Sequence, residues 1–420
     1  MNQLKSLVYK YHSSVFFLLL VGISITLPFS IKYNSLLIIL FVLYWILFLY
    51  SSNSVTIRNP KLFSSIFLFF LTYMYGALIS SDIQSAIKDI EQKLSLFILP
   101  LVLASIPVLS RKKLHLIVVS FIVSCFVISI LTFRNGLSFL EAEHRVWAMQ
   151  DLILMHRPML GLYCASCIFF ILALIFSIRK LYLQILGTSL ALWFFFFLII
   201  INAKMSFLAF AISSFIVFLI YLFQRRNKWI GTVVILAFIA SFYVLFLVND
   251  AVNSFITALI NFEPFSYEKY SSMMVDSFNV RFGIWKCCKE VLNTDLTWLT
   301  GTGTGDSRLL LIDCYNRNNY TVQAQEMLNA HNQYLESWLT MGLIGLVILI
   351  SVLLFAIVDG IKQKQFIFYS FVILYMICAI SESLFDTQKG VVIFTLFYSL
   401  FAFHLQVGNN VYTANKNIKI

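Results

Sequence analysis

The hydrophobic positions of this 420-residue chain fall into long apolar runs separated by short polar segments. A bilayer core is about 30 Å thick, so a crossing helix needs about 20 apolar residues. Helices are expected because each satisfies its own backbone hydrogen bonds in lipid. The pattern predicts twelve spans, at about 13–30, 34–50, 61–80, 94–109, 114–133, 158–178, 182–201, 205–223, 229–248, 334–357, 366–382 and 391–406.

The distribution of cations predicts the orientation of these spans. With the N-terminus in the cytoplasm, the basic runs 111–113, 179–180 and 225–228 all lie inside. Of the acidic residues, Asp359 alone then lies inside. Both termini are therefore expected in the cytoplasm. The first run has no small-x-small cleavage site, so we expect it to stay as a membrane helix.

Composition agrees with this reading. Hydrophobic residues make up 60% of the chain, charged residues only 12%, and the mean hydropathy is +0.88. An average soluble chain carries roughly 25% charged residues. The net charge of +11 reflects cations that anchor the topology, and no basic and aromatic segment typical of nucleic-acid binding is present. The chain is expected to be an all-α polytopic membrane protein without a nucleic-acid partner.

Two segments on the predicted outer side are too long to be simple turns. They are 134–157 and 249–333, and the second carries most of the polar chemistry of the chain. Functional residues are often found on such segments, held by a rigid scaffold. We expect a single membrane domain over 1–420, with 249–333 as an embedded outer lobe between the ninth and tenth spans.

The cysteines divide between the spans and the lobe. Cys125, Cys164, Cys167 and Cys378 fall in predicted spans and are expected to act as small apolar residues. Cys287, Cys288 and Cys314 fall in the lobe, where conditions would be oxidising. A disulfide from Cys314 to Cys287 or Cys288 and three free thiols are both open.

Two motifs precede the tenth span. Residues 276–292 predict an amphipathic helix with Val280, Ile284, Cys288 and Val291 on one face. Arg281 and Trp285 project together from another face, either as part of a site or as an interfacial anchor. Residues 297–307 read TWLTGTGTGDS, in which alternate glycines permit a tight turn but no Walker lysine follows.

The sequence NAHNQYLESWLTMGLIG at 329–345 opens the tenth span. A helix N-terminus favours anionic groups, and a neutral imidazole there can take up a proton near pH 7. His331 is therefore a candidate general base, with an interfacial histidine bonded to a loop carbonyl as the alternative. On helical spacing Tyr334, Leu335 and Trp338 share its face, and Gly342 and Gly345 permit close helix contact.

Together these motifs resemble the O-antigen ligase and polymerase superfamily of Gram-negative inner membranes. The R-x3-W element, the G-x-G-x-G turn and the HNxYL signature with paired glycines occur in the family's order over about 276–350. The resemblance implies a GT-C-like fold and a metal-independent inverting glycosyltransferase without a cofactor. It also implies a periplasmic site, an undecaprenyl-diphosphate-linked glycan as donor, and lipid A-core or a growing glycan as acceptor.

The resemblance further implies roles for individual residues. His331 would be the catalytic base. Arg281, and Lys204 where the family has a second arginine, would bind the diphosphate. Arg157, just before the sixth span, is a further candidate for a phosphate contact by its position alone. Lys204 is a departure, because lysine supplies a point charge and not a planar fork. The residues expected to orient the sugars or the base are Trp285, Asn332 and Tyr334.

Ligation of O-antigen to lipid A-core, as part of lipopolysaccharide biosynthesis, is the favoured reaction. The alternative within the family is polymerisation of lipid-linked repeat units. A lipid-linked glycan flippase is the alternative from another class. Transport sites place ionisable residues at mid-membrane between repeats, whereas the charges of this chain lie almost entirely outside the predicted spans.

Overall fold

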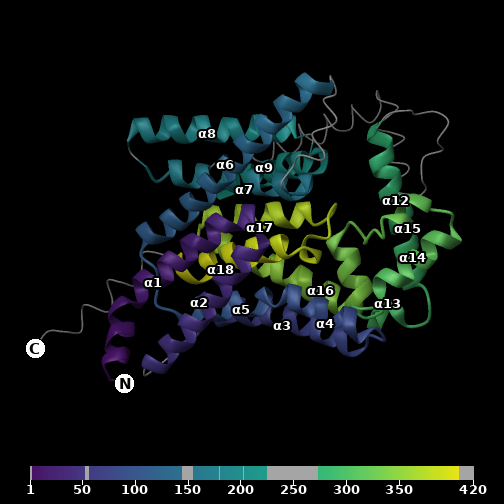
Figure 1. The fold of residues 1–420 in the computed structure, drawn as a ribbon, viewed down its shortest axis with the longest axis horizontal. Coiled ribbons are helices and arrows are strands. Elements are labelled where there is room, and N and C mark those ends of the chain that lie inside the picture. Colours follow the sequence, from purple (N-terminus) through teal and green to yellow (C-terminus); the bar gives the residue numbers. More distant parts are fainter. Residues whose placement is uncertain are drawn as a thin grey trace, which may run out of the picture.

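The computed structural model describes residues 2–52, 56–143, 155–178, 180–201, 203–224 and 273–405. Every regular element in these ranges is helical (Figure 1). In chain order the elements are α1 (Asn2–Phe29), α2 (Ile31–Ser51), α3 (Pro60–Leu78), α4 (Ile83–Lys93), α5 (Ser95–Ser105), α6 (Arg111–Glu143), α7 (Arg157–Ile175), α8 (Leu181–Ile200), α9 (Lys204–Gln224), α12 (Met273–Leu292), α13 (Thr297–Thr300), α14 (Ser307–Arg317), α15 (Thr321–Gln325), α16 (Gln333–Lys362), α17 (Phe366–Cys378), η2 (Leu384–Asp386) and α18 (Gln388–His404).

In the described part of the chain, 8 helices are long and apolar enough to cross a membrane. They are the Lys10–Phe29 part of α1, α2, α3, the Arg111–Gly136 part of α6, α7, α8, the Met205–Gln224 part of α9, and α16. Each coincides with one of the expected spans. The expected span at 229–248 lies outside the described residues.

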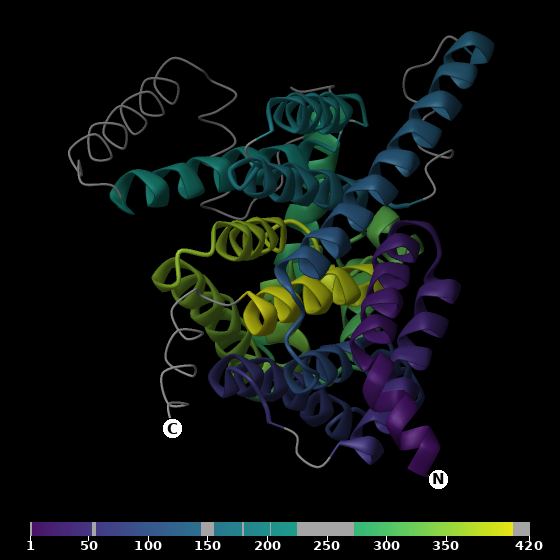
Figure 2. The same ribbon diagram turned by 90° about the vertical axis from the view of Figure 1, so that its left-hand side faces the viewer.

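Of the other three expected spans, two are shorter helices than predicted, and the third, α18, begins before its predicted start. They are α5 with 11 residues, α17 with 13 and α18 with 17. Both ribbon views place α17 and α18 in the middle of the bundle, between the N-terminal helices and α7–α9 (Figures 1 and 2). Nearly every residue of α18 from Gly390 to His404 is buried. A helix that is apolar on every side is buried. The hydrophobic runs therefore predicted that α5 and α17 are helices, but not where these helices end.

Aromatic rings fill the centre of the bundle. Phe397 of α18 lies 4.8 Å from Phe121 of α6 and 4.8 Å from Phe170 of α7, measured between ring centroids. Phe371 of α17 and Phe401 of α18 extend the same cluster. Tilted and edge-on ring pairs of this kind add to the stabilisation from burial alone. They fix α17 and α18, and therefore the connection between them, against the surrounding helices.

The glycine turn and α16 are built against each other. Gly301 and Gly303 have φ of 81° and 90°, and α16 is broken at Gly342, where φ is 67° and ψ is −169°. The amides of Thr302 and Gly303 donate to the carbonyls of Leu339 and Thr340, which the break releases from the helix. A Cβ on Gly342 would lie 2.1 Å from the Leu299 carbonyl oxygen at the end of α13. Close contact at Gly342 thus arises from a break in α16 and not from regular helix packing.

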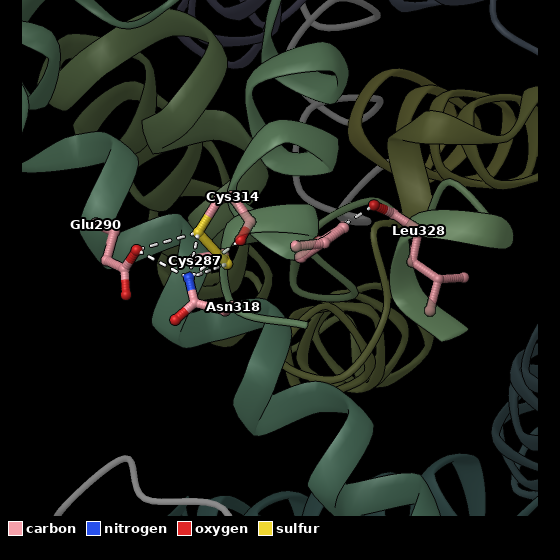
Figure 3. The surroundings of a disulfide bond; sticks show 6 residues. Cys287, Glu290, Cys314, Asn318 and Leu328 are labelled. Carbon is pink, nitrogen blue, oxygen red and sulfur yellow. Dashed lines mark hydrogen bonds between the residues drawn. A yellow bond between two sulfur atoms is a disulfide. The ribbon is translucent and has the colours of Figure 1, made fainter. Parts of the chain in front are cut away.

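Helices α12 to α15 gather at one end of the bundle, away from the N-terminus of the chain (Figure 1). They have their own hydrophobic cluster, in which Ile284, Cys288 and Val291 are buried as the amphipathic pattern predicted. A disulfide joins Cys287 of α12 to Cys314 of α14, with 5.7 Å between their Cα atoms, and leaves Cys288 as a buried thiol (Figure 3). This end of the bundle carries the motifs of the candidate site.

Candidate active site around His331

The segment that carries His331 is held from several sides. His331 has φ of 43°, in the left-handed region, and its amide donates to Asn329 Oδ1 over 3.1 Å. The neighbouring Ala330 donates its amide to Glu336 and accepts from the indole of Trp285 at 3.1 Å. A non-glycine residue keeps this conformation only where its surroundings determine it. The amides and acid around the histidine therefore fix its backbone.

The side chain of His331 faces an acid that the sequence analysis did not identify. Nδ1 of His331 lies 3.5 Å from Oε2 of Glu382, in the connection between α17 and η2. Only 11% of the Glu382 side chain is exposed, against 23% for His331. A carboxylate at Nδ1 orients an imidazole and stabilises its protonated form, which leaves Nε2 for chemistry.

Arg281 lies on the other side of the same acid. Its Nη2 is 2.9 Å from Glu382 Oε1, and its Nε donates to the Ser381 carbonyl at 3.4 Å. Burial alone would raise the pKa of Glu382, but the hydrogen bond from His331 and the charges of Arg281, His331 and His156 hold that pKa below its ordinary value. Glu382 is thus an ionised bridge between a guanidinium and an imidazole. Arg281 and His331 meet at one acid, although they lie 50 positions apart in the sequence.

His331 and Glu382 line a cavity of about 270 Å³. Its other polar walls come from His156 before α7, Arg308 of α14, Glu326, Asn329, Ser383 and Thr387. The Arg308 side chain is 51% exposed and pairs with Asp386 at 3.7 Å. Because half of the Arg308 side chain is exposed, its guanidinium can bind an anionic group while it stays paired with Asp386. We call this space the His331 cavity.

The remaining predicted cations, Arg157 and Lys204, do not line this cavity. Arg157 is the first residue of α7, directly after His156. Partial desolvation lowers the pKa of His156, Glu382 opposes that shift, and the nearby cations add to it. Lys204 begins α9, and Ser206 of the same turn donates to the Pro158 carbonyl at 3.0 Å. The Lys204 side chain lies outside the described part of the structure, but its backbone is next to the start of α7.

Three of the predicted site residues have structural contacts. Asn332 caps α16 by accepting from the amides of Tyr334 and Leu335. The Tyr334 hydroxyl donates to the Met376 carbonyl of α17 at 2.8 Å. The Trp285 indole holds the Ala330 carbonyl, one residue from His331. None of the three lines the His331 cavity among the described residues.

The prediction that His331 shares a helical face with three other residues is wrong. The helix begins at Gln333, so His331 lies before it with a non-helical backbone. Tyr334 then packs against the main bundle, whereas Leu335 and Trp338 pack against the cluster of α12 and α14. Asn332 caps the start of α16, so His331 is not in helical register with these residues.

The sequence analysis missed Glu382 and Arg308. Glu382 was assigned to the end of a span, because the apolar run from 366 was extended to 382, but α17 ends at Cys378. The polar run SESLFDTQKG at 381–390 was the available signal, since two acids there interrupt an apolar region. Arg308 stands directly after the glycine turn at the start of α14. The sequence alone does not indicate which residues Glu382 and Arg308 contact.

A metal site is not formed by the cysteines of this region. The ligand atoms of Cys287, Glu290 and Cys314 lie within 4.8 Å of one another. The two sulfur atoms are joined in a disulfide, however, and metal ligation requires thiolates. Asn318 donates to both Glu290 and the sulfur of Cys314, which completes a small polar cluster around the disulfide (Figure 3).

Comparison with known proteins gives one family. Residues 189–350 match the family model described as O-antigen ligase. The matched range holds Lys204, Arg281, Trp285 and His331, whereas His156 and Glu382 lie outside it. No curated protein matches the chain significantly. The family match runs through the His331 segment of a chain with membrane-length helices, so residues 189–350 are similar to the O-antigen ligase family.

Proposed function

We propose that the protein transfers a glycan from undecaprenyl diphosphate to an acceptor sugar hydroxyl on the periplasmic face of the bacterial inner membrane. The favoured acceptor is lipid A-core, which makes the protein an O-antigen ligase. The observation that carries the proposal is the His331–Glu382 pair in the wall of an open cavity that also holds Arg308. The family match supports glycosyl transfer of the ligase or polymerase type.

In the proposed reaction, His331 removes the proton from the acceptor hydroxyl. The oxygen attacks the anomeric carbon of the donor sugar from the side opposite the diphosphate. A carbon–oxygen bond forms, the bond from the anomeric carbon to the diphosphate oxygen breaks, and the configuration inverts. The Glu382 carboxylate at Nδ1 stabilises the imidazolium that results. General-base catalysis of this kind contributes about 10²–10⁴-fold to a rate.

The departing lipid diphosphate gains negative charge as its bond breaks. Cations placed to receive that charge lower the barrier. Arg308 lines the cavity directly, and Arg281 adds positive charge behind Glu382. Lys204 and Arg157 at the starts of α9 and α7 are proposed to contact the diphosphate from the other side of the cavity mouth. The reaction needs no metal ion or nucleotide in this scheme.

The proposal is tested by glycan transfer with purified protein in lipid vesicles. His331→Ala should lower the rate at least about 10²-fold while leaving expression and Tm near those of the wild type. His115→Ala is the matched control, because His115 lies near the other end of the bundle, at the start of α6. Wild-type transfer by His331→Ala, with normal protein levels, would remove the assignment.

The acceptor is identified by deleting the gene and examining the surface polysaccharide. Loss of attached glycan with accumulation of lipid-linked polymer identifies a ligase. A single repeat unit left on the core identifies a polymerase. Loss of attached glycan with single lipid-linked units confined to the cytoplasmic leaflet would identify a flippase instead.

A further inference from the structure

A second cavity adjoins the His331 cavity. It has a volume of about 350 Å³, and Arg308 and Met327 line both spaces. Its walls come from α3, α4, α14 and α16 and from the glycine turn, and they are rich in polar side chains. We call it the Tyr73 cavity after the tyrosine of α3 in its wall. Ligand pockets in proteins begin at about this size.

Three buried polar atoms in the wall of this cavity have no hydrogen-bond partner among the described residues. They are Tyr73 Oη, Asp89 Oδ2 and Thr304 Oγ1. The Tyr73 side chain is 2% exposed. Its hydroxyl faces Ser337, whose oxygen accepts a hydrogen bond from Gln333 Nε2. Each buried polar atom without a partner costs about 1–3 kcal/mol, and three such atoms at one cavity indicate that something else supplies the missing hydrogen bonds.

The same wall is connected to the His331 segment by two hydrogen bonds. Asn329 donates from Nδ2 to Asp386 Oδ2 over 2.9 Å, and Ala330 donates its amide to Glu336 Oε2 over 2.9 Å. Asp386 and Glu336 both line the Tyr73 cavity. A group bound there would therefore contact the acids that hold the two residues before the proposed base.

The chemistry of the wall selects the class of ligand. The acids Asp82, Asp89, Glu336 and Asp386 in the wall face the cations Lys88, Lys93 and Arg308, so no excess of positive charge selects an anion such as a diphosphate. Few apolar side chains are available for a lipid chain. Lys93 is paired with Asp89 and Asp386, so the charges largely balance. What remains are atoms that accept hydrogen bonds and hydroxyls that both donate and accept. A sugar ring offers several hydroxyls that do both.

We propose that the Tyr73 cavity is a subsite for one sugar ring of a substrate glycan, next to the reacting centre. This inference rests on the proposed function, because it takes glycans as the substrates. A ring hydroxyl would donate to Asp89 and accept from Tyr73 or Thr304. Water occupies the cavity in the absence of the glycan and is displaced when the ring binds. The ring belongs to the acceptor or to the donor, and the experiment distinguishes the two.

The test removes single hydroxyl groups without changing side-chain shape. Tyr73→Phe and Thr304→Val should each raise the KM for one substrate about threefold to tenfold, the effect of one lost hydrogen bond. The kcat should change by less than about twofold, because the His331 cavity is intact. An effect on the acceptor KM identifies an acceptor ring, and an effect on the donor KM identifies a donor ring.

Two matched controls remove the same groups elsewhere. Tyr44 of α2 and Thr132 of α6 also have buried hydroxyls without a partner among the described residues, and neither lines the His331 or the Tyr73 cavity. Tyr44→Phe and Thr132→Val should leave both KM values unchanged. Unchanged KM values in Tyr73→Phe and Thr304→Val as well would overturn the inference and leave the cavity to water.

A binding measurement separates this inference from the proposed function. Saturation-transfer NMR would use the free oligosaccharides released from the donor and from the acceptor. Signals on a sugar ring should be present with the wild type and the double variant Tyr44→Phe/Thr132→Val, and lost with Tyr73→Phe/Thr304→Val. Binding of this kind without transfer activity would sink the proposed function alone. Transfer activity with signals equal in all three proteins would sink the subsite alone.

Discussion

At the scale of single residues, the candidate site is organised around one acid. Glu382 lies between the guanidinium of Arg281 and the imidazole of His331, at 2.9 Å and 3.5 Å. The two bases hold the pKa of the acid down although burial opposes this. Glu382 is therefore ionised over the whole range in which a histidine titrates. It can orient His331 in both protonation states of the imidazole.

This arrangement predicts how stability depends on pH. Because the pKa of Glu382 is lowered in the folded protein, its contribution is fully present above its ordinary value of 4.5 and is lost as the pH falls through the lower folded pKa. The Tm of the wild type should exceed that of Glu382→Gln between pH 5 and 8. Thermal unfolding of the purified protein from pH 3 to pH 8 measures both curves, which should converge below pH 4.5.

The control for this series is Glu326→Gln. Glu326 is an exposed acid that lines the same cavity, and its replacement should leave the Tm close to that of the wild type across the range. A difference between wild type and Glu382→Gln that does not shrink as the pH falls below 4.5 would contradict the assignment to the carboxylate.

At the scale of elements, the break in α16 joins the lobe helices to the bundle. The glycine turn donates two amides to carbonyls that an unbroken helix would use internally, and Thr304 donates its amide to Gly76 of α3. The turn thus contacts both α16 and α3. The His331 segment lies at the start of this same helix, so its position relative to Arg308, just after the turn, depends on the break.

Gly342→Ala should destabilise the protein strongly. The backbone at Gly342 lies in a region reserved for glycine, and an added Cβ would lie 2.1 Å from a backbone oxygen. The expected cost is about 3 kcal/mol or more, equivalent to a fall in Tm of roughly 5 °C. Differential scanning fluorimetry in detergent measures this.

Gly22→Ala is the comparison for this substitution. Its Cβ would meet only the movable side chain of Leu37, at 3.1 Å. Alanine is also the better helix former, so the Tm should be kept or slightly raised. Equal Tm values for the two alanine variants would mean that the break does not need glycine.

At the scale of the whole molecule, the described residues form a helical bundle with a polar, disulfide-linked group of short helices at one end (Figure 1). Eight helices have the length and apolarity of membrane spans, while α17 and α18 are enclosed by other helices. The distribution of cations predicts that the end with α12 to α15 is on the outer side.

Labelling in sealed inner-membrane vesicles of right-side-out orientation tests this topology. The free cysteines of the described residues are buried, so labelling reports on the added cysteine. Lys289→Cys on α12 should react with a membrane-impermeant maleimide at once. Lys112→Cys at the start of α6 should react only after the vesicles are opened. The reverse pattern would invert the predicted orientation and place His331 on the cytoplasmic face.

The amino-acid sequence by itself determined the class of the protein and the segment that carries the candidate site. Long apolar runs require helices in lipid, and the amphipathic pattern at 276–292 predicted which face of α12 is buried. His331 and Arg281 were identified from motifs, and these motifs lie within the range that matches the family. Such patterns and motifs involve residues close together in the chain, so the sequence alone reveals them.

Only the tertiary structure decided which residues meet. The Arg281–Glu382–His331 cluster joins three segments distant in sequence, and no periodicity encodes such a contact. Asn332 and Tyr334 belong to the HNxYL motif, but their side chains cap α16 and bind α17. They do so because α16 begins after His331, which leaves His331 outside the helix. Helix lengths were also decided by packing, since a helix enclosed by protein need not match the thickness of a bilayer. Side-chain convergence depends on how the whole bundle packs, and that is a property of the fold and not of any one segment.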